Sequence, residues 1–281
     1  MTHTSGLPPY APVSELQEKY GSPNPKGLME YISTCKREFK PQTKFQYSCL
    51  NYITLQHIIE TITGQSLRDF AKENIFDILG MQYTDYLPTI QQQDGKWINT
   101  VACPWMDWIA PTEKQKDGSV LCGQVHDPLA RILNGGISGN AGIFSNANDI
   151  GILAAALLNG GEYNGRRILS PLGVKTMCTV PRELTAFGRT PGWDIFSPYA
   201  SNKGDLFSPN TFGHTGYTGT SIIIDPDNDT AVILLVNAVH PEDRHSIVRL
   251  RSLVANAVAA SICPPAQVYT CLLYTSDAAD E

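Results

Sequence analysis

Three short strings in this chain join residue types that can do chemistry. Ser33-Thr34-Cys35-Lys36 places a hydroxyl and an amine one helical turn apart, a spacing at which the amine can take or relay a serine proton. His126-Asp127 sets an imidazole beside a carboxylate, and His214-Thr215-Gly216 joins an imidazole, a hydroxyl and a residue without a Cβ. Strings this short arise by chance, so each gains meaning only from the segments around it.

The remaining candidate ligands do not indicate a metal or a nucleotide. His240 and His245 lie five residues apart and match no metal-ligand spacing. Seven cysteines are too sparse for a disulfide scaffold, and we expect mostly buried thiols packed as small hydrophobes. The glycines at 135, 136, 139 and 142 follow no strand, so they indicate a loop passing close to the site rather than a dinucleotide fingerprint. The sequence therefore predicts no cofactor and no metal.

The composition predicts a folded, acidic protein. Hydrophobic residues make up 42% of the 281 residues, which is enough for a sizeable core. The charge sum of 21 − 27 = −6 argues against a nucleic-acid partner, because such proteins carry a basic face. No apolar run approaches about 18 residues, so no transmembrane segment is predicted. The start of the chain does not have the pattern of a secretory signal peptide.

The elements that must position these residues begin with helices. Residues 1–27 are rich in Pro, Gly and Ser and predict a loop. Apolar spacing predicts a short helix from Leu28 to Phe39 and a stronger one from Tyr47 to Thr63, whose apolar residues follow one helical period. Ser66 is expected to cap a further helix over 67–79.

The middle of the chain is irregular before helices return. Residues 82–147 contain no long periodic segment, and a stretch of that length inside a domain is usually functional. Asn148 is expected to cap an apolar helix that continues to about Leu158. Ser170-Pro171 opens another short helix, with Pro in its favoured first position.

The last part of the chain switches to the period of strands. We expect strands over Trp193–Phe196, Phe212–Asp225 and Thr230–Ala238, the last two joined by the turn at 225–229. The apolar residues of 242–262 lie on one face of a final helix, which would pack across this hairpin. Helices followed by an antiparallel hairpin and a closing helix indicate an α+β fold.

The two ends do not resemble natural ends of a domain. Residues 1–8 have the character of a domain interior, so Met1 is expected to be an internal residue of a longer protein. The tail from Cys271 to Glu281 follows a Pro264-Pro265 stop and resembles translated sequencing adapter, so we expect residues 264–281 to be a non-native or disordered tail. The predicted domain is 1–263, incomplete at its amino-terminal side.

Five stretches, in order along the chain, resemble the serine β-lactamase-related family, which includes class C β-lactamases, low-molecular-mass penicillin-binding proteins and esterases. The stretches are THTSGLP at 2–8, FQYSCLNYITL at 45–55, IFDILGMQYT at 75–84, GGISGNAGIFSNANDI at 135–150 and FGHTGYTGTSIIIDP at 212–226. Each motif alone is weak, and the ordered set makes the resemblance specific.

The resemblance implies acyl transfer through a serine ester. In the family a Ser-x-x-Lys pair begins a helix, a Tyr from a Tyr-x-Asn motif faces it as a base, and a Lys-Thr-Gly or His-Thr-Gly strand forms the opposite wall. By resemblance, Tyr47 is the general base and acid. His214 and Thr215 would orient the substrate, Gly216 leaves room for close backbone approach, and the N–H of Tyr217 is an oxyanion donor.

The chain departs from the family at two points. Cys49 stands where the family usually has Asn in its substrate-binding position, and a thiol is a poor partner for a substrate amide, which puts β-lactam turnover in doubt. We interpret Cys49 as a packed thiol rather than a nucleophile. The Ser-x-x-Lys string at Ser33 lies only 47 − 33 = 14 residues before Tyr47, so we interpret it as a coincidence. The nucleophile is expected upstream of Met1.

The resemblance therefore predicts an α+β fold of the β-lactamase and transpeptidase type, in which helices flank an antiparallel sheet with the hairpin 212–238 at its centre. The first strands and the Ser-x-x-Lys helix are expected to be missing. The intact protein would be a periplasmic or extracytoplasmic serine hydrolase acting on a small ester or a cell-wall D-amino-acid amide. A non-catalytic member that binds cell-wall peptide or a partner protein, and a true β-lactamase or D-Ala-D-Ala carboxypeptidase, stay open as alternatives. His3 and His126-Asp127 are expected to be structural.

Overall fold

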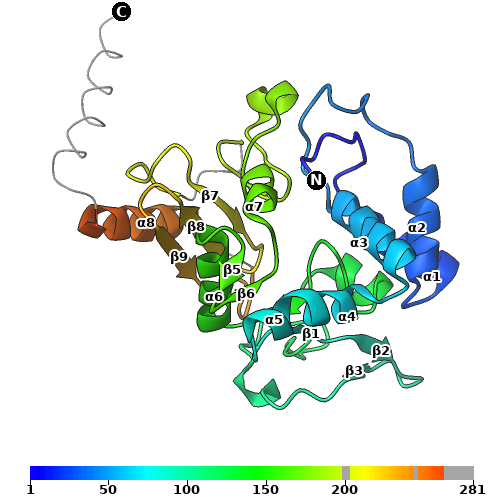
Figure 1. Cartoon of the computed structure of the whole chain (residues 1–281). Helices are drawn as coiled ribbons and strands as arrows, with labels where there is room; N and C mark the ends of the chain where they lie inside the picture. Colours follow the sequence, from blue (N-terminus) through cyan, green and yellow to red (C-terminus); the bar gives the residue numbers. More distant parts are fainter. Residues whose placement is uncertain (198–202, 244–245, 263–281) are drawn as a thin grey trace, which may run out of the picture.

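A computed structural model describes residues 1–197, 203–243 and 246–262. Figure 1 shows the amino-terminal helices on one side and a three-stranded sheet on the other, with the amino terminus and α3 near the middle. The order is α1 (Val13–Tyr20), α2 (Pro25–Thr34), α3 (Cys49–Thr63), α4 (Leu67–Ala71), a π-helical turn (Lys72–Phe76), α5 (Asp77–Leu79), β1 (Asp85–Tyr86), β2 (Thr89–Gln91), β3 (Trp97–Asn99), a 3-10 turn (Met106–Trp108), a π-helical turn (Leu129–Leu133), β4 (Ile143–Phe144), α6 (Ala147–Leu158), β5 (Glu162–Tyr163), β6 (Arg166–Arg167), α7 (Pro171–Met177), a 3-10 segment (Arg182–Phe187), β7 (Phe212–Thr215), β8 (Ser221–Asp225), β9 (Thr230–Leu234) and α8 (Val248–Ile262).

The amino-terminal helices share one core. Leu28 on α2 and Leu50 on α3 are both at most 1% exposed, and they pack with Leu129 of the π-helical turn. The prediction of a loop over 1–27 is wrong for α1, because Leu16 is buried in this cluster and tertiary packing stabilises a helix that weak local signals do not announce. The helix predicted from Leu28 to Phe39 begins earlier, at Pro25, and ends at Thr34.

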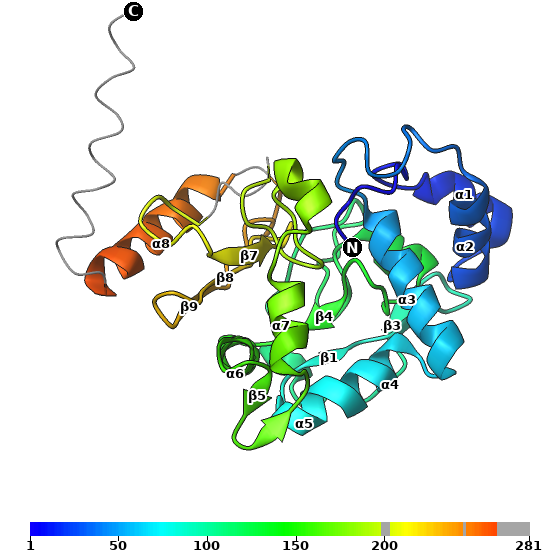
Figure 2. The same cartoon turned by 45° about the horizontal axis from the view of Figure 1, so that its top comes forward.

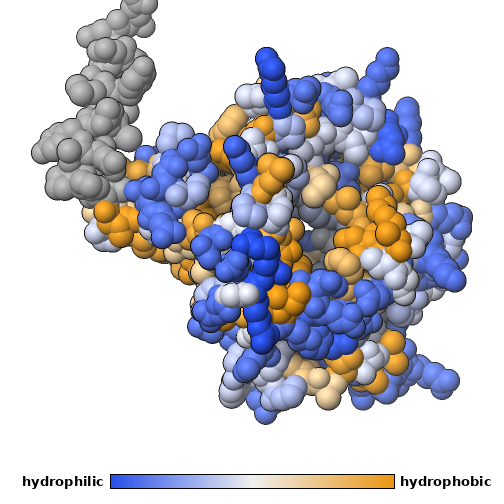
Figure 3. All heavy atoms as spheres, in the orientation of Figure 1, coloured by the Kyte–Doolittle hydropathy of each residue, from blue (hydrophilic) through white to orange (hydrophobic). Residues whose placement is uncertain are grey.

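The helices predicted over Tyr47–Thr63 and 67–79 form close to the expected bounds. Helix α3 begins at Cys49, with Ser48 before it, and ends at Gly64 in the left-handed conformation. Ser66 caps α4 by accepting the Asp69 N–H, as predicted. The expected single apolar face of α3 is only partly confirmed, because Ile58 and Ile62 are 45% and 78% exposed. Figure 3 shows apolar side chains gathered over α3.

The irregular middle segment is closed by short strand pairs. Strand β1 pairs with β4, which brings Asp85 opposite Phe144, and β2 pairs with β3 as a hairpin. Helix α6 then begins after Asn146, whose side chain accepts the Asp149 N–H, so the cap predicted at Asn148 is two residues too late. Ser170 caps α7 with Pro171 at its first position, as predicted.

The three-stranded sheet is antiparallel in the order β7-β8-β9, with His214 opposite Ile222 and Ile223 opposite Val232. The single strand predicted over Phe212–Asp225 is wrong, because the chain reverses between β7 and β8 at residues 216–220. Trp193–Phe196 is not a strand, since only Asp194 makes isolated bridges there.

Helix α8 crosses one side of the sheet, as predicted, although it begins at Val248 rather than near 242 (Figure 2). Ala255 of α8 packs against Ile223 and Val232 in one buried cluster. On the other side of the sheet, α6 and α7 pack on Phe212 and Ile224. The tail at 264–281 lies outside the described residues. Within the described ranges, no helix is both long and apolar enough to cross a membrane.

Candidate functional site

Tyr47 lies immediately before helix α3, where the amino-terminal helices approach strand β7. Its ring stacks on the imidazole of His3, with the ring centroids 4.2 Å apart and an interplanar angle of 24°. Tyr47 also lies near His214, at 6.3 Å between ring centroids, and the guanidinium carbon of Arg189 lies 5.7 Å from the Tyr47 centroid. The structure therefore brings together the phenol and the imidazole that the sequence places 167 positions apart (214 − 47 = 167).

His3 holds the start of α3 in place. Its ring is fully buried, and its Nδ1 accepts the backbone N–H of Ser48 at 3.1 Å and lies 3.3 Å from Nδ2 of Asn51. Those contacts leave the proton on Nε2, which has no hydrogen-bond partner among the described residues. Burial, followed by the Arg189 charge, lowers the pKa of His3 to about 3, so the ring is neutral. This placement agrees with the structural role that the sequence suggests.

His214 projects from β7 into the same region. Its Nδ1 lies 3.0 Å from the carbonyl oxygen of Thr215, and its Nε2 lies 3.2 Å from Nη2 of Arg189. A carbonyl can only accept and a guanidinium can only donate, so the proton is on Nδ1 and the Nε2 lone pair is the acceptor. Burial and the Arg189 charge both lower the pKa of His214, which again indicates a neutral imidazole.

Residues 215–220 form the tight turn that follows His214. Thr215 is the last residue of β7 and pairs with Ser221, and the Gly216 N–H donates to the Thr220 carbonyl at 2.8 Å. A Cβ on Gly216 would lie 2.2 Å from Oγ1 of Thr220, so a side chain at this position would displace that hydroxyl. From α8, Nη2 of Arg251 donates to the carbonyls of Gly216 and Thr220 at 2.9 and 3.0 Å.

Tyr217 lies at the tip of this turn. Its side chain is 76% exposed, its ring stacks on His126 at 5.7 Å, and its hydroxyl donates to Asp243 at 2.5 Å. That hydrogen bond raises the pKa of Tyr217. Its backbone N–H has no intramolecular acceptor within the described part of the chain. The backbone N–H of Tyr217 is therefore available as a hydrogen-bond donor, while its phenol is hydrogen-bonded to Asp243 at the surface.

Arg189 is the residue of this site that sequence reasoning missed. It is 2% exposed, and its Nη1 donates to Asp194 at 2.9 Å. The two residues flank the turn Pro191-Gly192, where the chain folds back on itself. A Pro-Gly turn flanked by residues of opposite charge could have predicted this ion pair from the sequence, because such a turn brings its flanking residues opposite each other.

Cys49 is the first residue of α3 and packs beside the helical core. Burial, followed by the nearby Asp127 charge, raises the pKa of its thiol to about 11, so the sulfur stays protonated. This environment fits a packed thiol and not an activated nucleophile. The side chain of Asn51 contacts His3 instead of taking over the position of the family's Asn.

The Ser-x-x-Lys string lies away from this constellation. Ser33 is exposed near the end of α2, and its hydroxyl donates to the Glu30 carbonyl of the same helix at 2.8 Å. Helix α2 packs on α1 and α3, on the side of the molecule remote from β7 (Figure 1). The geometry gives this serine no contact with Tyr47 or His214 among the described interactions.

The other sequence candidates form local contacts. His126 pairs with Glu113 at 3.0 Å and not with the adjacent Asp127, which instead accepts the hydroxyl of Tyr10 at 2.9 Å. His240 lies 2.8 Å from the Thr112 carbonyl, and His245 lies outside the described residues. The glycine-rich loop passes close to α3, since a Cβ on Gly139 would lie 2.0 Å from the Tyr52 carbonyl.

The described part of the chain contains no group of three or more His, Cys, Asp or Glu side chains that could hold a metal ion. Its five described cysteines are free thiols, and the expectation that they are mostly buried is wrong, because four are half-buried and Cys122 is exposed. These positions lie at element ends and in loops, where the cores do not cover them.

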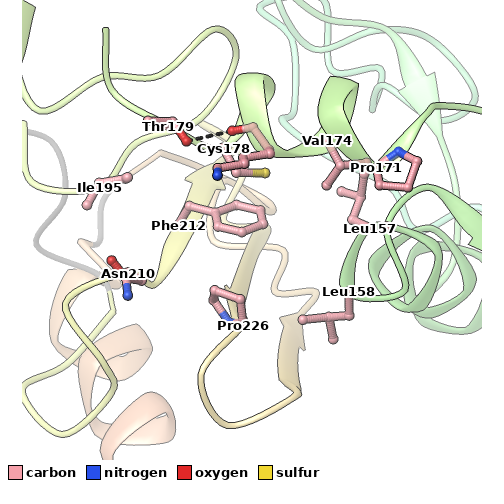
Figure 4. A pocket seen from close by; sticks show the side chains of 12 residues that line it. Leu157, Leu158, Pro171, Val174, Cys178, Thr179, Ile195, Asn210, Phe212 and Pro226 are labelled. Carbon is pink, nitrogen blue, oxygen red and sulfur yellow. Dashed lines mark hydrogen bonds between the residues drawn. The ribbon is translucent and has the colours of Figure 1, made fainter. Parts of the chain in front are cut away.

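A cavity of about 340 Å³ opens elsewhere, between α6, α7 and β7 (Figure 4). Its lining is mainly apolar, with Leu157, Val174, Ile195 and Phe212 pointing inward. Cys178 also lines it, but burial raises the pKa of that thiol to about 11. The cavity lacks the convergent polar groups of a catalytic site, so the constellation around Tyr47 remains the candidate site.

Comparisons with known proteins agree with this fold. A family model described as Beta-lactamase matches residues 1–256. An Escherichia coli K12 protein, curated under the provisional name D-alanyl-D-alanine carboxypeptidase, is 34% identical over 254 residues, covering 85% of this chain and 56% of that protein. The chain thus spans about half the length of the curated relatives it matches.

Two solved structures match most of the chain. A beta-lactamase from Mycobacterium bovis has a TM-score of 0.57 at 18% identity, covering 93% of this chain and 72% of that one. EstCE1, described as a hydrolase with promiscuous acyltransferase activity, has a TM-score of 0.56 at 18% identity, covering 90% of this chain and 69% of that one. The predicted α+β fold of the β-lactamase and transpeptidase type is therefore confirmed.

Proposed function

The chain belongs to the beta-lactamase family, and from this premise we propose that its whole protein is a serine hydrolase that forms an acyl-enzyme. The proposed substrate is an ester or a D-amino-acid amide of cell-wall type. The observation that carries the proposal is the convergence of Tyr47 and His214, from distant parts of the chain, beside the turn that presents the Tyr217 N–H. The nucleophile would come from a Ser-x-x-Lys pair in a part of the protein outside this chain.

The residues present can each support one part of that reaction. The serine hydroxyl attacks the substrate carbonyl while its proton passes to the oxygen of Tyr47, acting as general base. The negative charge that develops on the carbonyl oxygen is stabilised by the backbone N–H of Tyr217. The C–N or C–O bond then breaks, and Tyr47 returns the proton to the leaving amine or alcohol. Water hydrolyses the acyl-enzyme by the same steps in reverse order.

The β7 wall would orient the substrate. The side chain of Thr215 carries the only hydroxyl of the His-Thr-Gly string, and it would contact a carboxylate or an equivalent polar group of the substrate. His214 next to it is neutral, so it would act by hydrogen bonding and packing and not as a charge. Gly216 lets the substrate backbone approach the turn closely.

The identity of the relatives favours a D-alanyl amide as the first substrate to test, in an extracytoplasmic location where cell-wall peptides occur. Cys49 disfavours efficient β-lactam turnover, because its protonated thiol cannot replace the hydrogen bonds of an Asn amide to a β-lactam side chain. The substitution Cys49→Asn in the whole protein would therefore raise its rate of acylation by a penicillin.

The test is a hydrolysis assay with the whole protein on an aryl ester and on a peptide ending in D-Ala-D-Ala. Turnover of either substrate that is lost in Tyr47→Phe supports the proposal. A whole protein that lacks Ser-x-x-Lys, or that binds cell-wall peptide without cleaving it, would overturn the proposal in favour of a binding member of the family. Efficient turnover of a penicillin would instead indicate a true β-lactamase.

A further inference from the structure

Arg189 is held in place by the backbone as well as by its side chain. It forms an antiparallel bridge with Asp194 across the turn at 190–193, and Asp194 in turn exchanges two backbone hydrogen bonds with Gly213 of β7, at 2.9 and 3.0 Å. The short hairpin therefore continues the sheet beyond β7. Asp194 lies beside Gly213, the neighbour of His214, and Arg189 lies on the far side of Asp194. Ser197 supports the carboxylate of Asp194 with its N–H and its hydroxyl.

The guanidinium contacts the imidazole of the site and lies over the ring of the phenol. Nη1 donates to Asp194 at 2.9 Å, Nη2 donates to Nε2 of His214 at 3.2 Å, and the central carbon lies 5.7 Å from the Tyr47 ring centroid. Its Nε–H is buried and has no hydrogen-bond partner among the described residues. A buried cation with one unused donor is costly unless the surrounding chemistry uses its charge.

This contact decides the protonation state of His214. If Nε2 carried a proton, an N–H of the imidazolium would face an N–H of the guanidinium, and two positive charges would lie in contact. With the proton on Nδ1 alone, both ring nitrogens are satisfied, by Thr215 and by Arg189. The lowered pKa of His214, caused first by burial and then by Arg189, agrees with this arrangement.

We propose that Arg189, and not the histidine of the His-Thr-Gly strand, supplies the positive charge on the β7 side of this site, where it positions His214 as a neutral Nδ1–H imidazole and stabilises negative charge on the oxygen of Tyr47. The second part rests on the proposed function, because it concerns Tyr47 as a base. Arg189 is a positioning residue in this account. It acts through Tyr47 and His214 rather than on the substrate.

Other charges near the pair do not replace Arg189. Asp194 offsets part of the guanidinium charge and favours a proton on His214, opposite in sign to the effect of Arg189. His3, which stacks on Tyr47, is neutral, and the positive amino group of Met1 acts on His3. Lys203 lies near Asp194, and burial lowers its pKa. Among the residues that the structure describes, Arg189 is therefore the cation in direct contact with the imidazole.

The first part is tested on the chain itself by NMR of the ring nitrogens of His214, assigned with His214→Gln. In the native chain we expect an Nδ1–H tautomer whose titration midpoint lies below the ordinary histidine value of 6.5. The control Asp194→Asn keeps Arg189 and leaves no unpaired carboxylate, and it should preserve the neutral ring. Arg189→Met in the Asp194→Asn background removes the charge, and the midpoint of the His214 titration should rise by at least 1 pH unit relative to Asp194→Asn.

The variant Arg189→Lys, also made in the Asp194→Asn background, distinguishes the effect of the positive charge at position 189 from the effect of side-chain packing there. Lysine keeps a positive charge but lacks the planar fork, so the titration of His214 should stay closer to that of the control than to that of Arg189→Met. A native His214 that titrates near pH 6.5, or that carries its proton on Nε2, would overturn the proposal. The measurement on the native chain requires no activity, and the NMR spectrum of each variant shows whether that variant has folded.

The second part is tested on the whole protein through its pH profile. Arg189→Met with Asp194→Asn should shift the acidic limb of kcat/KM to higher pH by at least 1 unit relative to Asp194→Asn, while Arg189→Lys should restore much of that shift. An unchanged acidic limb would overturn the role toward Tyr47. If the whole protein has no activity while His214 is the neutral tautomer, the proposed function fails and the assignment of His214 stands.

Discussion

At the scale of single residues, the sequence predicted Tyr47, His214, Thr215, Gly216 and Tyr217 as one site, and the structure places them around one turn of backbone. Their catalytic roles stay predictions. The sequence did not predict Arg189, because a buried arginine is recognised by what surrounds it and not by its own neighbours in the chain. Nor could composition reveal that the histidine is neutral, since its protonation depends on a contact across 25 positions.

His3 makes a prediction about stability and pH. Its pKa is lowered from its usual 6.5 to about 3, so the unfolded chain binds a proton below pH 6.5 that the folded chain does not. The free energy of unfolding should therefore be fully developed above pH 6.5 and fall by about 1.4 kcal/mol per pH unit below it from this residue alone. Urea unfolding between pH 7.5 and 5 measures the slope.

The matched control is His3→Asn. Asparagine tolerates the left-handed backbone of this position, where φ is 56°, and offers an acceptor for the Ser48 N–H, but it does not titrate. The variant should lose stability at every pH and show a shallower dependence. An unchanged slope in His3→Asn would contradict the assigned pKa, as would a native His3 ring that titrates by NMR near pH 6.5.

Cys49 makes a prediction about reactivity. Because its thiol pKa is raised from 9.0 to about 11, its thiolate fraction at pH 8 is about 100-fold lower than that of an ordinary thiol. Alkylation by iodoacetamide in the folded protein, followed by mass spectrometry of the peptides, should label the exposed Cys122 first and Cys49 at least 10-fold more slowly. If Cys49 reacted faster than Cys122, it would be an activated nucleophile and the packed-thiol interpretation would be wrong.

At the scale of elements, hydrophobic period and capping residues located α3, α4, α6 and α7 to within a few residues, because those signals are local. Helix α1 was missed, since its stability comes from burying Leu16 against other helices. The reversal at 216–220 was also missed, although Gly216 and Gly219 are turn signals in the sequence. Hydrogen bonds within the turn and from helix α8 hold it.

Arg251 supplies two of those hydrogen bonds, so it should control the turn. In Arg251→Met the carbonyls of Gly216 and Thr220 lose a buried donor, and we expect the free energy of unfolding to fall by about 2 kcal/mol. Amide hydrogen exchange at 216–220 should accelerate more than exchange in β9. The exposed Arg249 on the same helix offers the control Arg249→Met, which should change neither quantity. Equal effects of the two variants would show that Arg251 does not hold the turn.

At the scale of the whole molecule, the chain covers 56% of its curated relative, and the residues it contributes form two walls of a site without a placed nucleophile. We expect the 281-residue chain to hydrolyse p-nitrophenyl acetate no faster than a denatured control. Any residual rate should be the same in Ser33→Ala, since the Ser33 hydroxyl bonds to its own helix on α2. Hydrolysis that depends on Ser33 would contradict this account of the site.

The central claim is that Tyr47 drives acylation of a serine supplied by the rest of the protein. The measurement is the intact mass of the whole protein after a timed exposure to a fluorophosphonate, which phosphonylates an activated serine oxygen with loss of fluoride. The adduct is mapped by peptide fragmentation. The account predicts one adduct, on the serine of a Ser-x-x-Lys pair, that forms about 100-fold or more slowly in Tyr47→Phe. An adduct that forms equally fast in Tyr47→Phe, or no adduct on any Ser-x-x-Lys serine, would contradict it.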